Sequence, residues 1–113
     1  MIKISIPLPE KISSNKIYAG QHWSIRKKQA DLFHLSLLEF RKIRTRDFPI
    51  SIDFIFRYKG RLLDIDNNFY MVKLLIDALR SNEIIPNDTP EFINEISITT
   101  EKGVKDEVDI FLN

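Results

Sequence analysis

Two aspartates separated by one residue, Asp64 and Asp66, are the clearest candidates for chemistry in this chain of 113 residues. In an extended segment, residues two apart face the same side, so the two carboxylates would lie next to each other. Two anions about 4 Å apart repel by roughly 4 kcal/mol near a protein surface, and a bound cation relieves that repulsion. Carboxylate oxygens favour hard ions such as Mg²⁺ or Mn²⁺. The pair therefore suggests a divalent-metal site, although Asp-x-Asp also occurs in turns and calcium loops.

A third carboxylate, Asp88, follows the predicted second helix in the loop 86–90. It could join the pair if this loop returns along the helix, or it could cap a turn ahead of Pro90. The spaced Asp and Asn residues, glycine and terminal Glu of an EF-hand are absent, so a calcium loop of that kind is not expected.

Charge is divided unevenly along the chain. Residues 1–46 carry ten Lys and Arg against three acidic residues, a net charge of +7, whereas residues 47–113 carry seven against thirteen, a net charge of −6. A basic part can attract a polyanion while an acidic part gathers carboxylates around cations. The division favours a metal-dependent enzyme acting on nucleic acid, although basic residues can equally coat a solvated helix.

The composition argues against several other classes of protein. There is no cysteine, which excludes disulfides, thiolate nucleophiles and cysteine zinc sites. The apolar fraction of 43% predicts a packed core. The first residues predict no signal peptide, and no run of about 18 apolar residues is present in the sequence. We therefore expect a soluble, cytoplasmic, single domain over residues 1–113 that is not associated with a membrane.

The elements that position the acidic residues follow from hydrophobic periodicity. Period-two alternation or extended character predicts five strands, over residues 2–7, 50–56, 61–66, 96–99 and 108–112. A first helix begins near Ser24 as its N-cap and shows an apolar stripe formed by Ala30, Phe33, Leu37 and Phe40. A second, buried helix runs from about Asn68 to Arg80, with Phe69 expected in the core. The order βαββαββ predicts an α+β domain with a mixed or antiparallel sheet and two helices on one side.

The central part of the chain resembles the signature of the RusA family of Holliday junction resolvases. The resemblance rests on Asp64-Ile65-Asp66-Asn67, then Lys73, then Asp77-Ala78-Leu79, then Asn87-Asp88, in the order found in that family. The N-terminal Pro7-Leu8-Pro9, Ser14-Asn15 and the stretch 18–23 are also similar, so the likeness spans nearly the whole chain.

This resemblance implies a function and a set of site residues. It implies a Mg²⁺-dependent endodeoxyribonuclease, with Mn²⁺ as a substitute, that cleaves branched double-stranded DNA as a homodimer, in recombination or repair and in a phage or prophage setting. Asp64, Asp66 and Asp88 would be the metal-binding carboxylates, and Lys73 the essential lysine. Lys73 is aligned by its spacing before Asp77, because the stretch after Asp66 is about three residues longer than in familiar members. Asn87 stands where many members have an acid.

The other polar residues have less specific roles. Asp77 could bond Lys73 or orient a ligand, and a structural role is favoured. Asn67 is interpreted as a helix N-cap in preference to a metal ligand, and His22 and His34 are interpreted as structural. The residues expected to contact DNA phosphates are basic, and they are Arg26, Lys27, Lys28, Arg57, Lys59 and Arg61, with Arg41, Lys42, Arg44 and Arg46 as further candidates. Phe69 and Tyr70 could stack on unpaired bases, although core packing is expected for Phe69.

Two other functions remain open. The chain could be a module that grips branched DNA without cutting it, with a degenerate metal site. It could also be a calcium-stabilised structural domain, which would melt in a Ca²⁺-dependent way and show no salt-sensitive DNA binding.

Overall fold

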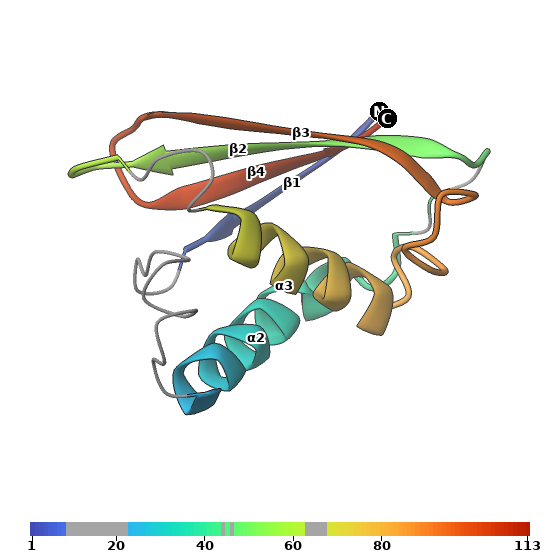
Figure 1. Ribbon diagram of the computed structural model, residues 1–113, viewed down its shortest axis with the longest axis horizontal. Coiled ribbons are helices and arrows are strands. Elements are labelled where there is room, and N and C mark those ends of the chain that lie inside the picture. Colours follow the sequence, from blue (N-terminus) through green and yellow to red (C-terminus); the bar gives the residue numbers. More distant parts are fainter. Residues whose placement is uncertain (9–22, 44, 46, 63–67) are drawn as a thin grey trace.

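The part of the chain that the structure describes contains a four-stranded sheet, whose strands form where apolar and polar residues alternate (Figure 1). The computed structural model describes residues 1–8, 23–43, 45, 47–62 and 68–113. The strands are β1 (Ile2–Pro7), β2 (Ile50–Tyr58), β3 (Ile93–Lys102) and β4 (Glu107–Leu112). In β2 the even-numbered residues from Ile50 to Tyr58 are buried and the odd-numbered ones are partly exposed, which is the predicted period of two.

The sheet is mixed, with the strand order β1-β4-β2-β3. β4 pairs antiparallel with both β1 and β2, while β3 pairs parallel with β2 at the edge. The predicted α+β class is therefore confirmed. The predicted order differs in one element, because Arg61 and Leu62, at the start of the expected third strand, lie in no strand, and residues 63–66 lie outside the described residues.

Two helices cover the same face of this sheet (Figure 1). Helix α2 (Trp23–Leu37) continues into the short 3-10 helix η1 (Leu38–Phe40). Its predicted stripe is confirmed, since Phe33 and Leu37 are fully buried and Phe40 packs against the core. The helix begins at Trp23, so Ser24 lies inside it and is not its N-cap.

Helix α3 (Phe69–Ser81) is the second predicted helix, and it buries most of its apolar residues in one core with α2 and the sheet. The Tyr70 hydroxyl donates a hydrogen bond to the buried Gln29 side chain of α2. The Asn82 amide donates to the backbone carbonyl of His34 at 3.1 Å, so His34 marks a structural helix–helix contact. Phe69 departs from the prediction of a core residue, because 57% of its surface is exposed.

The face of the sheet opposite the helices is held together by a polar network around Asp109. This residue is only 3% exposed. It accepts hydrogen bonds from Ser5 of β1 and Arg57 of β2, and Lys3 lies 3.8 Å from it. Burial opposes ionisation of Asp109, but the Ser5 hydrogen bond and the hydrogen bond and charge of Arg57 outweigh it, and the pKa of this carboxyl is lowered. The network links three strands through one charged group.

The lowered pKa of Asp109 makes stability depend on pH. The carboxyl stabilises the fold above its unfolded pKa of about 3.9, and this stabilisation is lost as the pH falls through the lower pKa of the folded state. We expect Asp109→Asn to lower the free energy of unfolding by about 1.5–3 kcal/mol at neutral pH. Urea denaturation of both proteins should show this difference shrinking below about pH 4. A difference that stayed constant into acid would contradict the assignment.

No helix in the described ranges is long and apolar enough to cross a membrane.

Candidate active site

The start of α3 is anchored to the sheet by one buried side chain, Asn68. Asn68 is completely buried. Its side-chain oxygen accepts a hydrogen bond from the Tyr58 hydroxyl at 2.7 Å, and its amide donates to the Thr100 hydroxyl at 2.8 Å. Burial, with the charge of Asp106 as a smaller cause, raises the pKa of the Tyr58 hydroxyl, so it stays protonated as the donor. Asn68 therefore ties the first turn of α3 to both β2 and β3.

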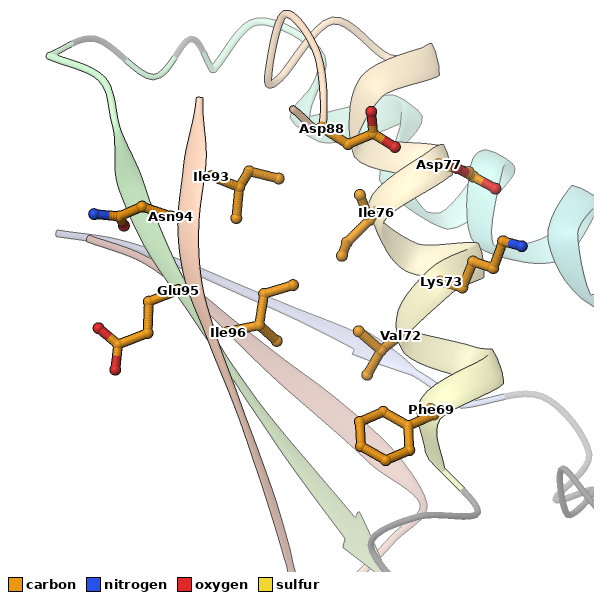
Figure 2. Close-up of a pocket in the computed structure, with 10 residues that line it drawn as sticks. All are labelled: Phe69, Val72, Lys73, Ile76, Asp77, Asp88, Ile93, Asn94, Glu95 and Ile96. Atoms are coloured by element: carbon orange, nitrogen blue, oxygen red, sulfur yellow. The ribbon is translucent and has the colours of Figure 1, made fainter. Parts of the chain in front are cut away.

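A groove runs between the exposed side of α3 and the edge strand β3, with a volume of about 410 Å³. We call it the α3–β3 groove. Figure 2 shows the apolar side chains of Phe69, Val72 and Ile76 pointing from the helix toward the strand. Lys73 and Asp77 follow one another along the helix, and Asp88 lies beyond them on the loop, next to the C-terminal end of α3. The groove thus combines an apolar floor with a charged rim.

An irregularity in β3 shapes the opposite wall of this groove. In the register with β2, Ile50 pairs with Ile93 and Ser51 pairs with Glu95, so Asn94 is the extra residue of a bulge. Ile93 and Ile96 consequently both point toward α3, whereas Asn94 and Glu95 point away from it (Figure 2). Ile96 is 43% exposed because β3 has no neighbour on its outer side in the described sheet.

The loop after α3 brings Asp88 back to the helix. The helix ends at Ser81, and Glu83 adopts a positive φ of 59°, which is a common way to end a helix. The next two residues, Ile84 and Ile85, are buried and fix the path of the loop. Asp88 then lies 3.8 Å from Arg80, and its own backbone N–H donates to the Asn87 side chain at 2.9 Å. Asn87 thus has a local structural role.

Four charged residues line the groove: the amine of Lys73 and the carboxylates of Asp77, Asp88 and Glu95, of which Glu95 points away from α3. Lys73 and Asp77 lie one turn apart on α3, and neither forms an ion pair with another described residue. Asp88 is 42% exposed, and its contact with Arg80 is long for an ion pair. The structure therefore brings Lys73, Asp77 and Asp88 together, and Asp77 belongs to this groove although the sequence suggested a structural role.

Asp64 and Asp66 lie outside the described residues. Among the residues that are described, no three acidic or histidine side chains cluster as a metal site would require. The donor chemistry in the groove nevertheless fits Mg²⁺, because Asp77 and Asp88 offer only carboxylate oxygens and the chain has no cysteine. His34 is occupied elsewhere, beside Asn82. The predicted ligand set stays a prediction.

The six main predicted DNA-binding residues lie in three places. Of the further candidates, Arg41 and Lys42 are exposed just after η1, and Arg44 and Arg46 lie outside the described residues. Arg26, Lys27 and Lys28 are exposed on the first turns of α2, with Lys27 paired to Asp31 at 3.2 Å. Lys59 and Arg61 are exposed beyond the end of β2. Arg57 lies on the face opposite the helices, where its side chain bonds Asp109 and Glu101. Arg57 therefore has an intramolecular structural role, and its contact with DNA stays a prediction.

The sequence did not reveal the anchoring role of Asn68 or the exposure of Phe69. Asn68 gave no signal of its own, because its hydrogen-bond partners lie 10 and 32 residues away along the chain. The dense apolar run that begins at Phe69 predicts a core position for this residue. Phe69 and Lys73 are four residues apart and therefore lie on the same face of the helix. The charged Lys73 indicates that this face is exposed to solvent.

No protein-family model matches the chain, and no curated protein matches it.

Proposed function

We propose that this protein is a Mg²⁺-dependent endonuclease that hydrolyses phosphodiesters at four-way or otherwise branched DNA junctions. The observation that carries the proposal is the α3–β3 groove. Lys73 and Asp88 are 15 residues apart in sequence but line one groove, on a helix that begins three residues after Asp66. This is the set of residues for which the resemblance to the RusA family implies a catalytic centre.

Asp88, with Asp64 and Asp66, would hold the ion. Bound Mg²⁺ would supply an activated water and neutralise the charge that builds up on the phosphate. All three carboxylates could bind one ion only if segment 63–67 ran along α3 toward Asp88. The reason is that the helix rises by about 12 Å between Phe69, at its start, and Asp77, which lines the groove with Asp88. Lys73, which lines the groove and whose amine is not paired with a described residue, would bind the non-bridging oxygens of the phosphate. The exposed Arg26, Lys27 and Lys28 would position the DNA through its backbone.

The assembly that suits this substrate is a homodimer. A four-way junction has two-fold symmetry, and its resolution needs two cuts placed symmetrically about that axis. Two copies of the chain related by a two-fold axis would present two such sites.

A cleavage assay tests the proposal. A synthetic four-way junction is incubated with Mg²⁺ and either the wild type or Asp66→Asn. We expect the wild type to produce nicked duplexes, and the variant to bind the junction but cut it at least about 100-fold more slowly, since a catalytic metal contributes several kcal/mol. Binding without cleavage by the wild type would identify a non-cleaving DNA-binding module. Ca²⁺-dependent melting without DNA binding would identify a structural domain.

A further inference from the structure

Phe69 is exposed at a place where its ring can serve a ligand. It is the only aromatic side chain among the described residues that is exposed, at 57%. Its ring points into the α3–β3 groove, toward β3 (Figure 2). Val72, Ile96 and Ile98 surround it and form an apolar hollow with a volume of about 300 Å³. An isolated exposed ring is ordinary, but a ring that lines an apolar hollow is a candidate contact surface.

The residue one turn further along α3 indicates what the ligand is. Lys73 lies about 6 Å beyond Phe69 along the helix axis and contributes to the same groove an ammonium group that is paired with no described residue. A flat apolar ring beside a cation matches a nucleotide, whose base stacks on the ring while its phosphate meets the cation. Volumes of 300–400 Å³ fall within the usual range for small-ligand sites.

We propose that Phe69 stacks on an unpaired base of the DNA, next to the phosphate that Lys73 binds. This inference rests on the proposed function, because it takes from it that the ligand is DNA. Without a bound ion the orientation follows from charge, because Asp77 and Asp88 occupy the other end of the groove and their unneutralised carboxylates would repel a phosphate there. A base in an intact duplex is already stacked, and freeing it costs a few kcal/mol, least where it is unpaired. Phe69 would therefore favour the branch point of a junction.

The test measures binding without metal, so that it does not depend on cleavage. Two single-stranded probes of equal length are used in EDTA: oligothymidylate, and a strand of abasic sites with the same number of phosphates. We expect the wild type to prefer the strand with bases. Phe69→Ala should lower affinity for that strand by roughly 5- to 150-fold and leave affinity for the abasic strand unchanged. Lys73→Ala should weaken binding to both strands equally.

Three further variants sharpen this result. Phe69→Trp should keep or strengthen the preference for bases, whereas Phe69→Leu, which keeps an apolar side chain without an aromatic face, should lose it. Leu35→Ala is the matched control, because Leu35 is exposed to a similar extent, at 59%, on α2 and away from the groove. It should bind both strands like the wild type. Equal affinity of the wild type for the two strands, or full binding by Phe69→Leu, overturns the proposal.

A second copy of the chain is the other possible occupant of this hollow. Sedimentation of the wild type and Phe69→Ala separates the two cases. Suppose that the wild type sediments as a dimer and Phe69→Ala as a monomer, and that the monomers of both proteins show the same preference for bases. The hollow is then a dimer contact, and the stacking proposal fails. The two proposals can also fail separately. If Phe69→Ala loses the preference for bases but the wild type never cleaves a junction, the endonuclease proposal is rejected and the stacking site is kept.

Discussion

Asp88→Asn is expected to slow cleavage of a four-way junction by about 100-fold or more while leaving the fold intact. Asp88 lines the α3–β3 groove, and its carboxylate is the described member of the proposed metal-binding set. Asparagine keeps the shape but loses the negative charge, so the ion is held weakly and the several kcal/mol that it contributes to the transition state are lost. Single-turnover cleavage at increasing Mg²⁺ concentrations measures the effect, and high Mg²⁺ should restore part of the rate.

The fold should tolerate this change because Asp88 does little for stability. Its side chain is 42% exposed, and its ion pair with Arg80 spans 3.8 Å. Exposed pairs of this kind contribute about 0–1 kcal/mol. The thermal midpoint of Asp88→Asn should therefore stay close to that of the wild type.

Two matched variants isolate the role of the carboxylate. Arg80→Ala removes the same ion pair but keeps the Asp88 carboxylate, and Glu91→Gln removes one negative charge from the same loop outside the groove. Both should cleave at nearly the wild-type rate. If Asp88→Asn cleaves as fast as these controls, Asp88 is not a metal ligand and acts only as a turn residue.

Local periodicity explains why much of the fold was predictable. The alternation in β2 and the apolar stripe of α2 are properties of neighbouring residues, and each survives in the structure with Phe54 and Phe33 completely buried. The α+β class follows from the order of such elements. The parallel pairing of β2 with β3 depends instead on how α3 crosses between them, which no local pattern encodes.

Burial at two positions was not predictable because it depends on distant partners. Asp109 lies between two core residues in β4, and alternation places it on the face opposite the helices. It is buried there only because Ser5 and Arg57 come from other strands to cover it. Phe69 shows the converse case, since the open edge of β3 leaves its side of α3 uncovered. Pattern alone cannot locate such gaps.

The candidate site was predictable in its residues more than in its geometry. Sequence order suggested Lys73 and Asp88, and the structure places both in one groove because Ile84 and Ile85 fix the returning loop in the core. The loop after α3 does return to the helix, since Asp88 lies 3.8 Å from Arg80. The convergence of Asp64 and Asp66 with Asp88 stays a prediction.

Asn68→Ala is expected to lower the free energy of unfolding by about 2–4 kcal/mol, a large part of the 5–15 kcal/mol typical of a domain. The change removes two buried hydrogen bonds, to Tyr58 and Thr100, and leaves a small cavity. Urea denaturation measures the loss. Asn94→Ala is the matched control, because Asn94 is exposed on β3 and should tolerate the same truncation.

A double-mutant cycle with Tyr58→Phe shows whether the Tyr58–Asn68 hydrogen bond causes the loss. The two residues share one interaction, so the effects of Asn68→Ala and Tyr58→Phe should fall short of additivity by at least about 0.5 kcal/mol. Simple additivity would mean that packing, and not this hydrogen bond, anchors α3. Because Phe69 and Lys73 follow directly on the helix that Asn68 holds, Asn68→Ala should also weaken binding of oligothymidylate at temperatures where the protein is still folded. Preserved binding would show that the groove keeps its shape without this anchor.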